Sequence, residues 1–191
     1  MTRLIKAAFA AATVIGLIDA ESVFAQTRQP TVQARTQAIV ASFNKSKRGV
    51  KEKYGVRVDK YKEVRSEPAI KANVRDYAGA YEVQGLGFSL DLRVDTNGNI
   101  AASGYEPVDA DATVMRRFTL RNARIDGALF TATKVYASGA AEPFEGVFIN
   151  RTSFESPSDR GVTTFGLGVI GPSMRVVGGV YIDRFFFERK R

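Results

Sequence analysis

From about residue 77 onward, apolar and polar residues alternate over short stretches of the chain. Within residues 88–95, the apolar side chains Phe88, Leu90, Leu92 and Val94 occupy every second position, as in a strand with one buried face. Asn97-Gly98 then forms a tight turn, because this pair accepts the positive φ angles that a hairpin needs. Similar stretches follow at residues 99–105, 114–122, 128–136, 144–154, 161–170 and 174–187. The pattern predicts a mainly β domain over residues 77–191, with about eight antiparallel strands in a barrel or a strongly curved sheet.

The last strands of this domain are rich in glycine and are apolar on both faces. Gly146, Gly166 and Gly168, followed by Gly178 and Gly179, lie inside predicted strands, where glycine often marks a bend or a close approach. One apolar face can fill a barrel, whereas the other needs a cover. We expect the cover to come from the N-terminal part of the chain.

The N-terminal segment carries a helical pattern. Its apolar residues are spaced 7, 4, 7, 4 and 7 apart, namely Val32, Ile39, Phe43, Val50, Tyr54 and Tyr61. An 11-residue repeat keeps one helix face apolar. The spacing predicts an amphipathic helix over residues 31–53 with Thr31 as its N-cap. Residues 56–58 fit an extended exit from the helix equally well.

The charge of the chain is concentrated in the same segment. The whole chain has a net charge of +8, and residues 26–65 carry 11 basic and three acidic residues. The expected polar helix face holds Lys45, Lys47, Arg48, Lys51 and Lys53. Either the helix packs on the β body with solvated lysines, or these residues contact an anionic surface such as lipid head groups or envelope polymer. No nucleic-acid-binding motif is present, so nucleic acid is not an expected partner.

The first 25 residues have the layout of a secretory signal peptide. Arg3 and Lys6 precede an apolar run, and Val23 and Ala25 are small residues suited to cleavage. No later stretch approaches the ~20 apolar residues of a membrane helix. We therefore expect an exported protein, periplasmic or extracellular, without a transmembrane segment after cleavage. Its expected parts are the signal peptide (1–25), a basic helical arm (26–65), a linker (66–76) and the β domain (77–191).

Composition narrows the chemistry further. The chain has no His, Cys or Trp, so it lacks the commonest general base, thiol nucleophiles and the usual soft metal ligands. We therefore expect a non-catalytic protein with no catalytic residue, metal or cofactor, and an enzyme that works without His is the least favoured alternative.

Several short motifs have a chemical and a structural interpretation, and we favour the structural one for each. Ser42 and Lys45 match a Ser-x-x-Lys pattern but lack its partner motifs. Asp95 to Asn99 resembles the start of a calcium loop without its later bidentate acid. Glu106 lies near Asp109 and Asp111, and we interpret these three residues as a solvated acidic loop.

Two further charged clusters are better explained by surface charge than by a site. Glu142 and Glu145, with Asp183 and Glu188, could supply a carboxylate pair of the glycosidase type, but most such acids are surface charges. The arginines at positions 116, 117, 121 and 124 are expected to form salt bridges.

Two segments carry a resemblance to a known class of protein. Tyr77-Ala-Gly79-Ala-Tyr81-Glu82, followed by a strand ending at Asp95-Thr-Asn-Gly98, resembles the start of lipocalin-like β-barrel modules of exported bacterial proteins. Residues 127–136 and 144–152 resemble the central strands of exported bacterial proteins of unknown function. The Gly-x-Trp signature of true lipocalins is absent. The resemblance implies a fold and no activity.

An eight-stranded barrel holds either packed side chains or one small ligand. If it is hollow, we expect an apolar or amphipathic ligand lined by aromatic residues; otherwise the same residues fill the core. The candidates are Tyr81, Phe144, Phe148, Phe165 and Tyr181. The sequence leaves the ligand and the oligomeric state open.

Overall fold

The computed structural model describes residues 30–53, 56–108, 113–177 and 180–190; within 46–61 and 172–183 it describes the backbone alone. A helix, α1 (Val32–Ser42), precedes the strands, and a single 3-10 turn, η1 (Val74–Tyr77), leads into the main β domain. The strands are β1 (Lys45–Lys53), β2 (Val56–Pro68), β3 (Gly79–Glu82), β4 (Ser89–Val94), β5 (Ile100–Pro107), β6 (Met115–Asp126), β7 (Leu129–Tyr136), β8 (Ala141–Phe154), β9 (Val162–Val177) and β10 (Val180–Arg189).

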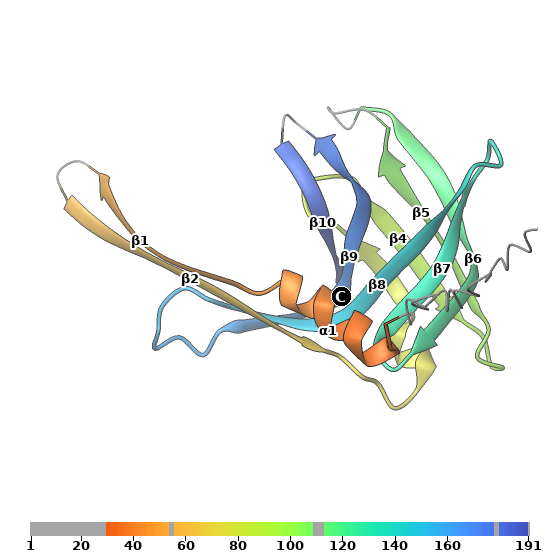
Figure 1. Ribbon diagram of the computed structural model, residues 1–191, viewed down its shortest axis with the longest axis horizontal. Helices are drawn as coiled ribbons and strands as arrows, with labels where there is room; N and C mark the ends of the chain where they lie inside the picture. Colours follow the sequence, from red (N-terminus) through yellow and green to blue (C-terminus); the bar gives the residue numbers. More distant parts are fainter. Residues whose placement is uncertain (1–29, 54–55, 109–112, 178–179, 191) are drawn as a thin grey trace, which may run out of the picture.

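Strands β3 to β10 form a closed antiparallel barrel of eight strands, which confirms the predicted fold class (Figure 1). Each of these strands pairs with the next one in sequence, including β8 with β9. One further pairing closes the ring, since β10 returns to β3 through Glu188–Glu82 and Arg189–Tyr81. The prediction of a single strand over residues 174–187 is wrong. Met174 belongs to β9, and β10 begins at Val180.

The predicted hairpin between β4 and β5 is confirmed in detail. Gly98 has a φ of +84°, a region that glycine enters without steric cost. The Asp95 carboxylate accepts hydrogen bonds from the backbone N–H groups of Asn97 and Asn99 at 2.8 and 2.9 Å. Because the Asp95 carboxylate stabilises its own turn, the hairpin accounts for the Asp95–Asn99 motif without a calcium ion.

The predicted N-terminal helix is confirmed for its first half and wrong for its second. Thr31 caps α1 through its Oγ1, which accepts the Ala34 N–H at 3.2 Å. The helix ends at Ser42, and residues 45–53 form β1, an edge strand paired with β2. An interior Gly49 costs a helix about 1 kcal/mol, and the alternating sequence of residues 56–64 supplies a strand partner for this segment. The Asn44 side chain stabilises the change of direction by accepting the Ser66 N–H at 2.7 Å.

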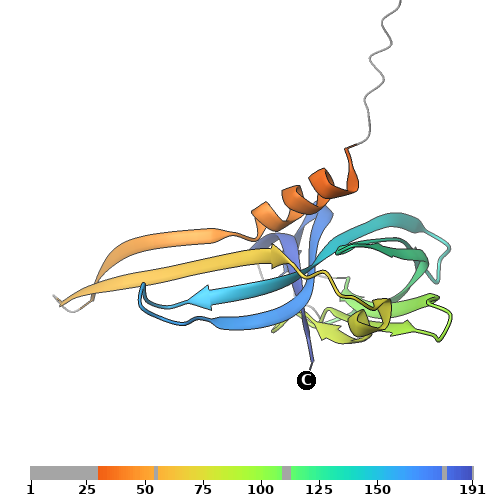
Figure 2. The same ribbon diagram turned by 90° about the horizontal axis from the view of Figure 1, so that it is seen from below.

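β1 and β2 form a hairpin that projects away from the barrel, here called the arm (Figures 1 and 2). The arm is joined to the barrel through β8. One edge of β8 pairs with β7 up to Val147 and then with β2 from Ile149 to Phe154. β8 therefore belongs both to the barrel and to the sheet that carries the arm, and the segment predicted as a linker begins within β2.

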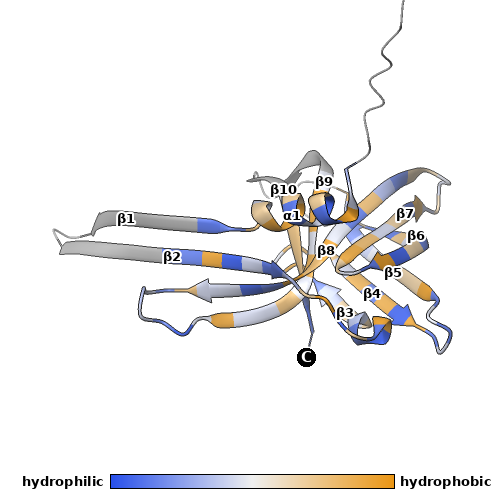
Figure 3. Ribbon diagram, turned by 60° about the horizontal axis from the view of Figure 1, so that its bottom comes forward, coloured by the Kyte–Doolittle hydropathy of each residue, from blue (hydrophilic) through white to orange (hydrophobic). Residues whose placement is uncertain are grey.

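Two apolar clusters hold the fold together. The larger one fills the barrel with inward-facing side chains, among them Phe88, Leu90, Leu92, Phe130 and Phe148. The smaller one lies outside the barrel, where α1 packs Ile39, Val40 and Phe43 onto Leu129, Val147 and Ile149. Figure 3 shows apolar residues concentrated in the barrel strands and along α1. The expected helical cover of an outward apolar face is thus present.

The glycines of the last strands permit close approach, as predicted. A Cβ on Gly168 would lie 2.8 Å from the ring of Phe43, and one on Gly166 would lie 2.3 Å from the Phe187 carbonyl oxygen. Real Cβ atoms do not approach other atoms so closely. Gly168 therefore makes the space in which α1 docks.

Candidate functional site

One end of the barrel is closed by stacked aromatic rings. Tyr77 and Phe148 have ring centroids 4.3 Å apart, and Phe148 stacks on Phe165 at 5.9 Å. The Tyr81 hydroxyl donates to the Tyr77 carbonyl, and burial raises the pKa of both tyrosines. Tyr81 and Phe148 are fully buried in this plug. Three of the predicted ligand residues, Tyr81, Phe148 and Phe165, therefore pack against one another.

The other end of the barrel contains a small pocket, here called the mouth pocket. It lies where β8 and β9 separate beyond their last paired positions, Gly146 and Val169. Its volume is about 40 Å³, room for about three water molecules. Its apolar wall consists of Phe88, Phe118, Phe144, Val169, Phe185 and Phe187.

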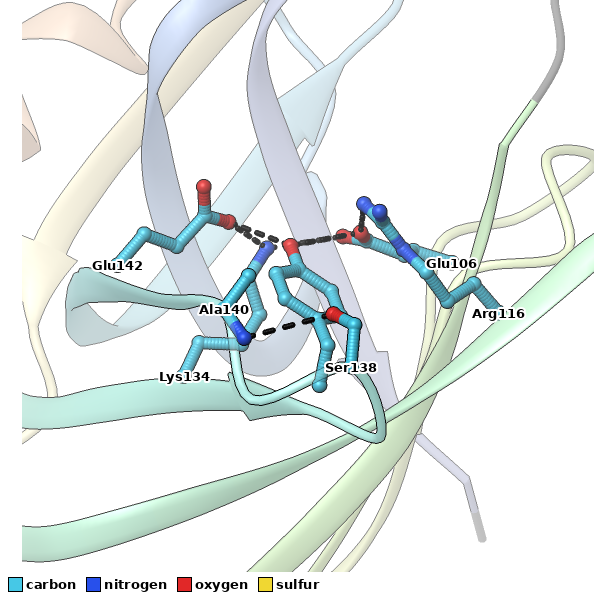
Figure 4. A network of polar contacts seen from close by, with 7 residues as sticks. Glu106, Arg116, Lys134, Ser138, Ala140 and Glu142 are labelled. Carbon is cyan, nitrogen blue, oxygen red and sulfur yellow. Dashed lines mark hydrogen bonds and ion pairs between the residues drawn. The ribbon is translucent and has the colours of Figure 1, made fainter.

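A cluster of charged side chains forms the polar wall of this pocket (Figure 4). The Nζ of Lys134 lies 2.8 Å from Glu106 Oε2 and 2.5 Å from Glu142 Oε1. Arg116 Nη2 donates to Glu106 Oε1 at 2.6 Å. The guanidinium of Arg116 also lies over the Tyr136 ring, 3.8 Å from its centroid.

Tyr136 joins the two carboxylates of the cluster. Its hydroxyl lies 2.8 Å from Glu106 Oε1 and 2.7 Å from Glu142 Oε1. A phenol has a single hydrogen, so it donates to one carboxylate at a time. The cluster combines two acids with two bases and is thus electrically balanced.

The environment keeps these groups ionised. Burial alone would raise the pKa of Glu106, but the hydrogen bonds from Lys134 and Arg116 outweigh it and lower the pKa to about 2. Burial would lower the pKa of Lys134, yet its hydrogen bonds to Glu106 and Glu142 raise it. A general acid or base works best with a pKa near the operating pH. Both shifts lead away from that range.

The outer rim of the pocket is braced by α1. Arg35 of α1 forms an ion pair with Glu145 on β8, and its Nε donates to Glu145 Oε1 at 3.2 Å. Hydrogen bonding to Glu145 raises the pKa of Arg35. The helix therefore touches β8 on the outer side of the strand, next to Phe144 on the inner side.

The structure places the predicted ligand-binding residues unevenly. Of the four members of that set whose side chains are described, Phe144 lines the mouth pocket, whereas Tyr81, Phe148 and Phe165 belong to the opposite end. Tyr181 lies in β10, and its side chain is outside the described part of the structure.

The residues predicted to contact an anionic surface lie on a strand instead of a helix. Lys45, Lys47, Arg48, Lys51 and Lys53 all belong to β1. Lys45 is exposed, and the side chains of the other four are not described. Because successive residues of a strand point to opposite faces, these five residues are distributed over two faces of β1.

The other motifs singled out from the sequence have structural roles where the structure describes them. The Ser42 hydroxyl donates to the Ile39 carbonyl oxygen of its own helix at 2.6 Å, while Lys45 lies on β1. Glu106 was wrongly expected in a solvated loop, since it lies in β5 and is 1% exposed. Asp109 and Asp111 lie outside the described residues. Arg116 forms a salt bridge, as expected.

Sequence reasoning missed Lys134, although a signal was present. Phe130, Ala132, Lys134 and Tyr136 occupy alternate positions of β7, so the period of two already places Lys134 with the apolar residues. Glu106 shares a face with Ala102 and Gly104 in the same way. Opposite charges at inward positions of two strands predict a buried ion pair.

Among the described residues, no helix has the length and apolar character to cross a membrane, and no group of three or more side chains is arranged as a metal site. The signal peptide predicted for residues 1–25 lies outside the described residues. No protein-family model, curated protein or solved structure matches this chain.

Proposed function

We propose that the protein is an exported, non-catalytic binding protein that takes up the apolar end of a small amphipathic ligand in the mouth pocket. The observation that carries the proposal is the composition of this pocket, which sets an aromatic wall opposite an ionised cluster at an opening of the barrel. Binding sites for small molecules typically combine a mostly apolar surface with a few fixed polar groups.

The size of the pocket limits how a ligand fits. About 40 Å³ accepts the end of an alkyl chain or a small ring, whereas a pocket that encloses a whole drug-sized molecule measures some 300–1,000 Å³. The rest of the ligand would lie outside, between β8 and β9.

The rim favours a particular head group. Glu142 and Glu145 both line the pocket, and their side chains are 30% and 35% exposed. Lys134 is 8% exposed and already contacts two carboxylates. A carboxylate can accept about four hydrogen bonds, so an ammonium or hydroxyl group of a ligand can donate to Glu142 and Glu145 beside their partners Lys134, Tyr136 and Arg35. A carboxylate head group has no hydrogen to donate to them.

The absence of catalysis is proposed on separate grounds. The chain has no His and no Cys. In addition, the buried Glu106 and Lys134 are held in their charged forms, with pKa values displaced away from neutrality. The cluster is therefore suited to orienting a ligand and poorly suited to proton transfer.

A pair of tryptophan reporters tests the proposal, since the chain contains no Trp. Phe144→Trp places the only indole in the mouth pocket, and Phe165→Trp, the matched control, places it in the plug. Decylamine, decanol and decanoate are titrated into each variant after removal of residues 1–25, with far-UV circular dichroism to verify folding. We expect a saturable blue shift at Phe144→Trp, strongest for decylamine and weakest for decanoate, and no shift at Phe165→Trp. Equal shifts in both variants, or none in either, would contradict the proposal.

A further inference from the structure

The register of the arm separates its charges between two faces. Residues directly opposite each other in an antiparallel pair lie on the same face, as do alternate residues along a strand. The pairs Lys45–Val64, Lys47–Lys62, Gly49–Lys60, Lys51–Val58 and Lys53–Val56 therefore share one face. We call this set the lysine face. It carries six lysines, three valines and no acidic residue among its ten described positions.

The opposite face of the arm has a different composition. It holds the pairs Ser46–Glu63, Arg48–Tyr61, Val50–Asp59 and Glu52–Arg57. Two arginines there face three acids, so this face is nearly balanced. All the excess positive charge of the arm therefore lies on the lysine face.

This segregation has a cost within the folded arm. Lys47 lies directly opposite Lys62, and Lys60 lies on the same face beside them. Like charges at directly opposite positions destabilise a strand pair. Lysine on an edge strand also prevents edge-to-edge pairing, but charges on either face would serve that purpose. An anionic partner lying against this face would offset the repulsion between its lysines.

We propose that the lysine face docks on the surface of a bilayer that contains anionic phospholipid. The nine residues of β1 extend for about 27 Å at a rise of about 3.4 Å per residue, and Figures 1 and 2 show the arm standing clear of the barrel. This provides a long surface that can lie along a membrane. The basic residues would attract anionic head groups over a Debye length of about 8–10 Å.

The valines favour a bilayer over a soluble polyanion. Val56 and Val58 lie on the lysine face at the end of the arm that is farthest from the barrel, opposite Lys53 and Lys51. Apolar groups interspersed with lysines match the interfacial region of a membrane, where apolar surface is buried while ammonium groups stay at the head groups. A soluble polyanion offers no apolar phase. The lysine face and the mouth pocket are different surfaces, so either proposed binding activity can be absent without the other.

Co-sedimentation with vesicles tests the inference. The protein without residues 1–25 is mixed with vesicles of phosphatidylglycerol and phosphatidylcholine (about 3:7), or of phosphatidylcholine alone, at low and high salt. Each lysine near an anionic surface contributes about 1 kcal/mol, so Lys51→Gln/Lys53→Gln should weaken binding about 30-fold. The matched control, Arg48→Gln/Arg57→Gln, removes the same charge from the opposite face and should change binding less than about twofold. Circular dichroism and thermal melting verify the fold of both variants.

A third variant separates the bilayer from a soluble polymer. Val56→Ser/Val58→Ser should weaken binding to the vesicles and leave binding of polyphosphate chains unchanged. Three outcomes would overturn the inference: no binding to anionic vesicles, equal losses in both charge variants, or binding to polyphosphate without binding to vesicles.

Discussion

At the residue scale, the main feature is a charged cluster built into an aromatic interior. Glu106 is 1% exposed and lies within hydrogen-bond distance of Lys134, Arg116 and Tyr136. Removing one partner of a buried ion pair leaves the other uncompensated. The cluster therefore links the stability of the barrel to the protonation of a single carboxylate.

We predict that Glu106→Gln lowers the free energy of unfolding by about 3 kcal/mol at pH 7 and that the difference shrinks to below about 1 kcal/mol by pH 2.5. The pKa of Glu106 is about 2 in the folded protein and ordinarily about 4.3. A lowered folded-state pKa contributes stability above the unfolded value, and this contribution is lost as the pH falls from about 4.3 towards 2. Urea denaturation of both proteins at pH 7, 5, 4, 3 and 2.5 measures the effect.

The matched control for this prediction is Glu145→Gln. Glu145 also forms an ion pair, but it is 35% exposed on the outer side of β8, so we expect a loss below about 1 kcal/mol. A difference between the wild type and Glu106→Gln that stays constant over the whole pH range would show that the network does not hold this carboxylate ionised.

At the element scale, the docking of α1 depends on the absence of a side chain at one position of β9. Phe43 fills the space above Gly168, next to Ile149. The sequence predicted both partners, since Phe43 belongs to the apolar stripe and Gly168 to the glycine-rich strands, but it could not pair them. Their contact joins residues far apart in the chain and depends on a register that no local pattern contains.

We predict that Gly168→Ala destabilises the protein by about 1–3 kcal/mol, the usual effect of overpacking. A new Cβ would lie 2.8 Å from the Phe43 ring. In a Phe43→Leu background the same substitution should cost less, because the smaller side chain leaves space. A double-mutant cycle in urea gives the coupling energy between the two positions, and strictly additive effects would contradict the proposed contact.

The helix that ends too early illustrates the limit of periodicity. The 11-residue apolar repeat continues through Val50, yet Lys45, Lys47, Lys51 and Lys53 also fit a period of two. Residues 45–53 form a strand and not a helix because residues 56–64 can pair with them. Only the folded chain reveals that pairing. The mouth pocket was missed for a similar reason, since charged residues at inward positions were interpreted as surface charges.

At the scale of the whole molecule, the barrel and the arm are joined through β8. The eight barrel strands close on themselves without β1 and β2. Alternation and turn residues were sufficient to predict the barrel, because every strand from β3 to β10 pairs with its neighbours in sequence. The attachment of β2 to β8 is a long-range pairing and had no counterpart in the sequence pattern.

We predict that the arm can be removed without unfolding the barrel. Lys45 lies directly opposite Val64, so a two-residue Asn-Gly turn can replace residues 46–63. The shortened protein should keep its melting temperature within about 5 °C, because no barrel pairing is lost. Thermal melting followed by circular dichroism provides the measurement, and loss of the cooperative transition would show that the barrel needs the arm.

The pairing of β10 with β3 determines when the barrel can close. Among the described residues, Glu188 pairs with Glu82 and Arg189 with Tyr81, and the Lys190 N–H donates to the Ala80 carbonyl oxygen at 2.8 Å. Closure must therefore wait until residue 189 has been synthesised, long after β3 to β8 have become available to pair. Until then β3 presents a free sheet edge, which is the kind of surface through which chains aggregate. The order of the strands thus leaves the chain open to aggregation until β10 has been made.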